Sequence, residues 1–142
     1  MNILTLENVT YQYEGMREGV LKGINATFER GKVYAIRGKS GAGKTTLLSL
    51  LAGLDLCTGG RILFEEEDLR SLDRDVYRAR DIGVVFQSFN LINNARAVEN
   101  IVLSMNISKC TVTDKKAYAY NLLERMGIDR ETANRTVLKL SG

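Results

Sequence analysis

The sequence predicts an α/β domain, built from a β-rich first third, a strand–loop–helix unit and a mostly helical remainder. β-branched and aromatic residues alternate loosely over residues 3–13 and 20–30, a pattern typical of strands. A short apolar run at 33–38 then leads through a glycine-rich loop into a helical pattern. From residue 97 onward, apolar residues recur at helical spacing. These three observations indicate mixed α and β structure.

The composition is that of a soluble globular protein large enough for one domain with its own core. Of the 142 residues, 44% are hydrophobic and 26% are charged. The net charge of +3, from 20 basic and 17 acidic residues, is too small to indicate nucleic-acid binding, so we expect no nucleic-acid partner. Because the chain has no histidine, Ser-His-Asp and Cys-His catalysis are excluded and the commonest zinc ligand is missing.

Targeting signals and cysteine usage predict a cytoplasmic protein. Cys57 and Cys110 lie far apart and match no metal-ligand spacing, which predicts free thiols in a reducing compartment. The sequence contains no run of about 18 apolar residues, so no transmembrane helix is predicted. The first residues also lack the basic-then-apolar layout of a signal peptide.

Short runs and turn residues predict the elements of the first two thirds of the chain. Residues 31 and 32 read as a turn, and the apolar run at 33–38 as a strand buried on both faces. A helix begins near residue 43 and ends at Gly53. "TGGRILFEE" predicts a turn and a strand, 73–80 a helix, and 81–87 a second short buried strand.

Two further helices are predicted in the last third. One spans 97–105, and a stronger one runs from about 114 to 126. Thr113 is the expected N-cap of the second helix and Gly127 its end. The apolar stripe of this helix consists of Ala119, Leu122, Leu123 and Met126.

The segment between the strand at 33–38 and the helix carries the chemistry. "GKSGAGKTT" fits the pattern G-x-x-x-x-G-K-[ST], a loop whose backbone N–H groups surround a phosphate at the positive end of a helix. Small residues let the backbone wrap closely around the anion. The predicted nucleotide-binding residues are Gly38, Lys39, Ser40, Gly41, Ala42, Gly43, Lys44, Thr45 and Thr46.

Three side chains of this loop have predicted roles. Lys44 supplies a mobile charge for the β- and γ-phosphates. Thr45 places a hydroxyl on Mg²⁺, and Thr46 can donate to the α-phosphate. The loop therefore predicts binding of a nucleotide phosphate group with Mg²⁺, and the rest of the sequence has to distinguish kinases, GTPases and ATPases.

With these residues the chain resembles the ATP-binding subunits of ABC transporters along its entire length. "LENVTYQY" is similar to the family's opening strand, "GVVFQSFNL" to its Q-loop, and the final "LSG" to the start of its LSGGQ signature. The resemblance implies a P-loop NTPase of ABC type, in which an antiparallel β subdomain accompanies the P-loop core and the C-terminal core strands are absent. It also implies one incomplete nucleotide-binding domain over 1–142, with 1–87 as β subdomain and core and 88–142 as helical subdomain.

The resemblance assigns roles to two residues outside the loop. Tyr13 would stack on the adenine ring, with Tyr11, two residues away on the same face, as the alternative. Gln87 would bring its amide oxygen to Mg²⁺ and to the attacking water, which makes it a metal ligand and, with Lys44, a catalytic residue. Without the resemblance, Tyr13 could simply pack on the sheet, and Gln87 could be an ordinary polar residue at a strand end.

The final residues correspond to the beginning of the family's signature segment. Ser141 and Gly142 would be its first polar members, which contact the ATP held by a second subunit in a head-to-tail dimer. The helix that completes this anion site is not in the chain, so we expect the site not to be built. We also expect the chain to be the N-terminal part of a longer subunit.

The resemblance further implies that this chain binds Mg-ATP without hydrolysing it, whereas the intact protein would be an ATPase. The family's Walker B strand and switch histidine follow the signature. Two other segments could be considered as a Walker B strand. Asp55 lies on or just beyond the P-loop helix, so it cannot also end a neighbouring strand. The acidic residues after 62–64 resemble instead the family's peripheral, solvent-facing turn. Without a Walker B neighbour, the strand at 33–38 would keep an unpaired buried edge, which predicts marginal stability or aggregation.

The leading interpretation is an ATPase subunit that powers export through a transmembrane permease at the inner face of the cell membrane. The segment after Gln87, through the helix at 97–106, would form the groove for the permease's coupling helix. "GLD" and "FQSFNL" look most like the branch that exports lipoproteins and antimicrobial peptides. Two alternatives stay open: a soluble ABC-type ATPase acting on DNA or ribosomes, and a non-catalytic nucleotide-binding fragment.

Overall fold

The computed structural model describes residues 1–140, and the chain divides into two compact units, Met1–Gly83 and Val84–Gly142. Both strands and helices occur in the first unit, whereas the second contains helices and connecting segments. Within the described residues, no helix combines the length and the apolar character that crossing a lipid bilayer would need.

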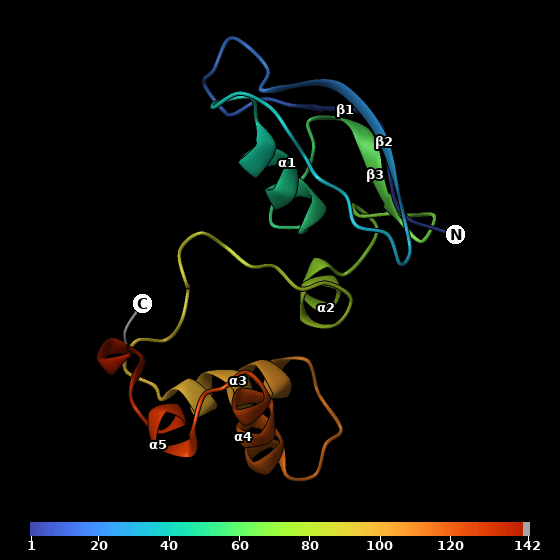
Figure 1. Cartoon of the computed structure of the whole chain (residues 1–142). Helices are drawn as coiled ribbons and strands as arrows, with labels where there is room; N and C mark the ends of the chain where they lie inside the picture. The colour runs from blue at the N-terminus through green and yellow to red at the C-terminus, as the bar shows by residue number, and fades with distance from the viewer. Residues whose placement is uncertain (141–142) are drawn as a thin grey trace. The chain divides into compact units, whose positions relative to one another are not determined.

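A four-stranded antiparallel sheet organises the first unit (Figure 1). Its order is β2 (Leu21–Glu29), β1 (Asn2–Tyr11), β3 (Gly59–Phe64) and β4 (Glu67–Asp68). The central strand β1 pairs with both β2 and β3, which confirms the two N-terminal strands and the later strand expected from the sequence. The acidic turn between β3 and β4 is exposed, as predicted.

Helix α1 (Lys44–Leu51) follows the glycine-rich loop and ends where the sequence predicted. Gly53 has φ +66°, a left-handed conformation that costs glycine little. Its N–H donates to the carbonyl of Leu50 at 3.0 Å, and the N–H of Leu54 donates to that of Ser49 at 3.0 Å. This pair of bonds satisfies two carbonyls that the helix end would otherwise leave open.

Side chains of helix α2 (Arg74–Arg80) donate hydrogen bonds to carbonyl groups at the C-terminal end of α1. The buried Tyr77 donates its hydroxyl to the carbonyl of Leu51 at 2.8 Å, and Arg78 donates to that of Gly53 at 2.5 Å. Side chains from the strands and from both helices meet in one hydrophobic core. Its buried members are Leu6, Val9, Tyr11, Leu21, Leu47, Leu50, Cys57, Ile62, Leu69 and Tyr77.

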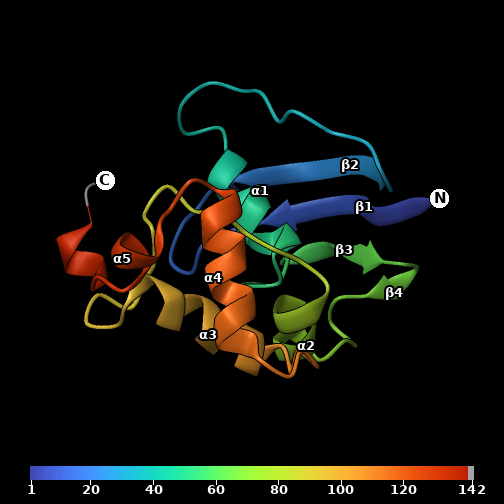
Figure 2. The same ribbon diagram turned by 60° about the horizontal axis from the view of Figure 1, so that its bottom comes forward.

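Two of the predicted strands are wrong. Residues 33–38 and 81–87 are neither strand nor helix, and Val33 and Val85 are fully exposed. A strand buried on both faces requires neighbours that complete its hydrogen-bond ladder. Among the described residues, no strand of the sheet pairs with either segment. Figure 2 shows the segment that leaves β2 running outside the sheet to reach α1.

The second unit is a small helical assembly around its own core. It contains α3 (Ala97–Ile107), α4 (Lys115–Arg125), α5 (Arg130–Ala133) and a 3₁₀ turn at Val137–Lys139. The first two confirm the helices expected from the sequence, and the short last two were not anticipated. The buried residues of this core are Val98, Ala119, Tyr120, Leu123 and Ala133.

Two details of α4 differ from the prediction. Asp114, not Thr113, caps the helix, because its carboxylate accepts the N–H of Ala117 at 2.9 Å. Met126 is exposed, and Tyr120 instead lies in the core, where its hydroxyl donates to Asn134 at 2.7 Å. The predicted apolar stripe is therefore right for Ala119 and Leu123, which are buried, and wrong for Met126.

Candidate functional site

The glycine-rich loop turns tightly just before α1. Gly41 and Gly43 have φ angles of +78° and +87°, which other residues adopt only with strain. The N–H of Ala42 donates to the carbonyl of Lys39 at 3.2 Å and closes the turn. Gly43 is also the N-terminal boundary of the helix, since its carbonyl accepts the N–H of Leu47 at 2.8 Å. The loop thus delivers the chain into the first turn of α1.

Lys44 lies across this loop. Its Nζ donates to the carbonyl oxygens of Gly38 and Lys39, at 2.7 Å in each case. Both acceptors are neutral, and Lys44 has no carboxylate partner among the ion pairs of the described residues. The ammonium charge is therefore positioned by the loop but not neutralised, which suits it to an anionic ligand.

The N-terminus of α1 differs from those of three other helices. Aspartate side chains cap α2, α4 and α5, namely Asp73, Asp114 and Asp129. Helix α1 has neither a capping side chain nor an acidic residue in its first turn. The free N–H groups and the positive end of the helix dipole at this position favour an external anion.

A pocket of about 460 Å³ opens at this helix terminus. It brings together most of the residues that the sequence predicted for nucleotide binding. The lining residues are Tyr13, Val20, Ser40, Gly41, Gly43, Lys44, Thr45 and Thr46. Gly38 and Lys39 take part through their carbonyl oxygens, and Ala42 lies in the turn between them and the helix.

The structure separates the two candidate tyrosines. Tyr13 lines the pocket, is 43% exposed, and its hydroxyl lies 2.8 Å from Oγ1 of the buried Thr46. Tyr11 is only 8% exposed and belongs to the hydrophobic core. Tyr13 is therefore the tyrosine placed to meet a ligand at the loop.

Two residues connected with this site were given no role in it by the sequence prediction. Val20 lines the pocket, but a single valine before a strand carries no recognisable signal. Asp55 accepts a hydrogen bond from the hydroxyl of Tyr11. This bond stabilises the ionised carboxylate of Asp55 and the protonated phenol of Tyr11. It therefore lowers the pKa of Asp55 and raises the pKa of Tyr11 to about 12.

The remaining predicted site residues are Gln87, Ser141 and Gly142. Gln87 belongs to the second unit, where it is exposed in a segment without helix or strand. Ser141 and Gly142 fall outside the described residues. Within the described part of the chain, no group of three His, Cys, Asp or Glu residues is arranged to hold a metal ion.

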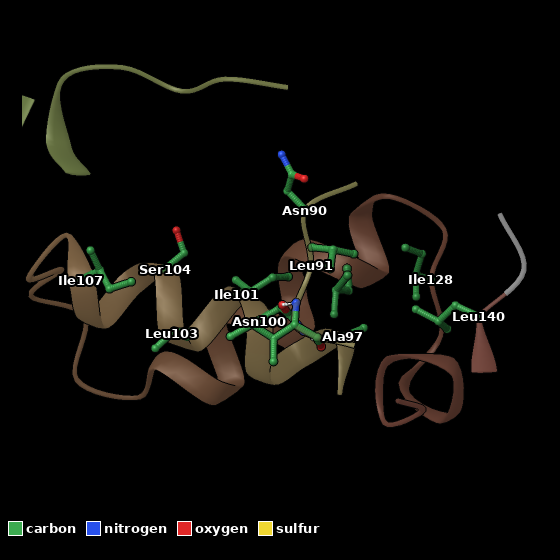
Figure 3. A pocket seen from close by; sticks show the side chains of 12 residues that line it. Asn90, Leu91, Ala97, Asn100, Ile101, Leu103, Ser104, Ile107, Ile128 and Leu140 are labelled. Carbon is green, nitrogen blue, oxygen red and sulfur yellow. Dashed lines mark hydrogen bonds between the residues drawn. The ribbon is translucent and has the colours of Figure 1, made fainter. Parts of the chain in front are cut away.

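The second unit carries an apolar groove along α3 (Figure 3). Ile101, Ser104 and Ile107 lie on successive turns of the helix and point to the same side, with Leu91 beside them. Ile107 is 62% exposed. The groove covers part of the segment in which the sequence predicted a partner-binding surface.

The loop and the first helix together define a phosphate-binding protein of the P-loop class. A family model described as ABC transporter matches residues 21–142. The chain belongs to this family.

Relatives with a known family assignment match nearly the whole chain. It is 35% identical over 142 residues to an uncharacterized ABC transporter ATP-binding protein, YclH of Bacillus subtilis, covering all of this chain and 63% of that protein. It is also 35% identical to the lipoprotein-releasing system ATP-binding protein LolD of Myxococcus xanthus, covering 95% of this chain and 62% of that one. The chain therefore spans less than two thirds of the length of these relatives.

The fold matches a solved ABC cassette as well. The structure described as a dimeric post-hydrolysis state of the ATP-binding cassette MJ0796, bound to ADP and Pi, superimposes with a TM-score of 0.87 at 30% identity. The match covers 98% of this chain and 63% of that one. This likeness confirms the predicted fold class.

Proposed function

We propose that this chain binds Mg-ATP at residues 38–46, as part of an ABC transporter ATPase subunit that powers export across a membrane. The observation that carries the proposal is the pocket at the uncapped end of α1, into which the loop directs an un-neutralised Lys44. A triphosphate supplies the negative charge that this arrangement lacks.

Each residue of the pocket has a part in this proposal. Lys44 leaves its two carbonyl acceptors and pairs with the β- and γ-phosphates, at little cost because both partners are neutral. Thr46 donates its hydroxyl hydrogen to the α-phosphate, which requires Tyr13 to be the donor in the 2.8 Å bond between the two hydroxyl groups. The ring of Tyr13, a residue that is 43% exposed, stacks on the base.

The residues also suit a magnesium ion that arrives with the nucleotide. Mg²⁺ is commonly held by few protein oxygens, together with phosphate oxygens and water. Thr45 lines the pocket and offers one hydroxyl. Among the described residues that line this pocket, none is acidic, so the ion depends on the triphosphate for its charge neutralisation. Gln87 is proposed as a second oxygen ligand that also positions water.

Binding of a fluorescent ATP analogue tests the proposal. In Lys44→Ala, the loss of the ammonium group is expected to weaken binding about 30- to 100-fold, since hydrogen bonds to charged groups are the strong ones. Lys32→Ala is the matched control, because Lys32 pairs with Glu29 and does not line the pocket. Equal affinities in the two variants would contradict the proposal.

The same samples test the expectation that this chain does not hydrolyse ATP. We propose that it binds without turnover, because no carboxylate among the described pocket residues can activate water beside the γ-phosphate. Phosphate release should therefore stay at the background rate at saturating Mg-ATP. Release that depends on Mg²⁺ and disappears in Lys44→Ala would refute this part.

The apolar groove supports the proposal of a permease partner at the inner face of the membrane. Exposed isoleucine and leucine side chains on α3 suit the apolar face of a short helix from another subunit. One relative, from Syntrophobacter fumaroxidans, is named a macrolide export ATP-binding/permease protein. A second ABC subunit is proposed as the other partner, in keeping with the dimeric cassette MJ0796.

A charge placed in the groove tests the permease contact. Ile107→Glu is expected to reduce co-purification of the permease from detergent-solubilised membranes roughly tenfold, because the carboxylate would be desolvated at the interface. Met126→Glu is the control, since Met126 is 80% exposed and does not line the groove. Equal recovery with both variants would argue against this surface.

A further inference from the structure

The ring of Tyr13 is held from two directions although it lies outside the sheet. Its hydroxyl is bonded to Thr46 on the first turn of α1, at 2.8 Å. The ring meets that of Tyr11 edge to face, with centroids 4.9 Å apart and planes at 88°. The backbone is also constrained, because the N–H of Met16 donates to the carbonyl of Tyr13 at 3.1 Å. One contact holds the phenol and another sets the plane of the ring.

Tyr11 is itself fixed by a residue from beyond the far end of α1. Its hydroxyl donates to Oδ2 of Asp55, while Oδ1 of the same carboxylate accepts the N–H of Leu56 at 2.8 Å. The backbone of Tyr11 is held as well, since its carbonyl accepts the N–H of Val20 at 2.7 Å. Asp55 therefore fixes the orientation of a buried ring that touches the pocket only through Tyr13.

These contacts form a chain from Asp55 through Tyr11 and Tyr13 to Thr46. Thr46 lies in the first turn of α1 and Asp55 lies beyond its C-terminal end, so both ends of this helix region contribute a bond to the two tyrosines. An edge-to-face contact favours one relative orientation of the two rings. A base that stacks on an already oriented ring loses less conformational entropy than one that must order a free side chain.

We propose that Tyr11 and Asp55 are positioning residues that hold the Tyr13 ring in the plane in which it stacks on the base of the nucleotide. This inference rests on the proposed function, since it concerns the same pocket. Neither residue touches the ligand. Both act through Tyr13, so they should affect recognition of the base and leave recognition of the phosphates unchanged.

Two ligands separate these contributions. ATP carries both base and phosphates, whereas inorganic tripolyphosphate carries phosphates alone, and both are titrated with Mg²⁺ by calorimetry. In Tyr11→Phe and Asp55→Ala, ATP should bind about five- to tenfold more weakly, with the affinity for tripolyphosphate changed by less than about twofold. Asp55→Asn, whose amide oxygen can still accept from Tyr11, should keep ATP affinity near that of the wild type.

Each other outcome has a distinct meaning. If Tyr11→Phe and Asp55→Ala weaken both ligands equally, the pair only supports the fold, and the proposal is wrong. If ATP affinity does not change in either variant, the ring needs no positioning, and the proposal is again wrong. Failure of the wild type to bind either ligand would overturn the proposed function itself. Tyr11→Phe keeps the buried ring, and its far-ultraviolet circular dichroism verifies that the protein stays folded.

Discussion

Gly43→Ala is expected to abolish measurable binding of the fluorescent ATP analogue, a loss of roughly 100-fold or more. Gly43 has φ +87°, and a left-handed backbone costs a residue with a Cβ about 1–2 kcal/mol. A Cβ there would lie 2.9 Å from side-chain atoms of both Val20 and Leu21, and 3.3 Å from the backbone oxygen of Val20. The side chains of Val20 and Leu21 or the loop itself would have to shift, and either movement disturbs the pocket that Val20 lines.

A second glycine serves as the control for this prediction. Gly31 has a similar φ of +78°, but a Cβ there would meet no atom within 4 Å. Gly31→Ala should therefore lower the free energy of unfolding by about 1 kcal/mol and leave nucleotide affinity unchanged. Nucleotide affinity in Gly43→Ala within about threefold of that in Gly31→Ala would contradict the predicted role of the tight turn.

Gly60→Ala is expected to lower the free energy of unfolding by about 4 kcal/mol, near the upper end for single substitutions. A Cβ at Gly60 would lie 2.2 Å from the carbonyl oxygen of Asn8 and 2.4 Å from that of Glu7. These are backbone atoms, which cannot rotate away. The pairing register of β1 with β3 shifts between Glu7 and Thr10, and Asn8 has φ +50° there, so Gly60 faces β1 at a bulge.

Urea unfolding followed by circular dichroism measures this effect, with Gly15→Ala as the control. Gly15 has φ +80°, and a Cβ at this residue would have no atom within 4 Å, so its substitution carries backbone strain without a collision. The difference between the two variants isolates the cost of the collision between strands. Similar losses in both variants would show that β1 and β3 separate easily at the bulge.

Most helices were predictable because their signals are local. The end of α1 follows from Gly53, whose conformation closes the helix by bonds to residues within the preceding turn. The predicted N-cap of α4 was wrong by one residue. Thr113 and Asp114 are both good capping residues, and only the bond from the N–H of Ala117 to Asp114 shows which of them caps the helix.

The prediction of two buried strands was wrong because a strand depends on partners that are not local in the sequence. The apolar runs at 33–38 and 81–87 suit a central strand, but a strand exists only when another strand supplies its hydrogen-bond partners. Among the described residues, the sheet ends at β2 on one side and at β4 on the other, and it includes neither segment. Composition alone carries no information about whether that partner is present.

The phosphate-binding loop and the family could both be recognised before any fold was known. The glycines, Lys44 and Thr45 are contiguous, and the turn into the helix brings them together without help from distant residues. Which tyrosine lines the pocket, and that the other one is bonded to Asp55, became clear from the packing. Tyr11 and Tyr13 have the same side chain and lie close together at the end of one strand, so their roles depend on packing against α1 and on the bond to Asp55. The bonds to Asp55 and Thr46 join residues that are far apart in the chain, and residue spacing does not encode them.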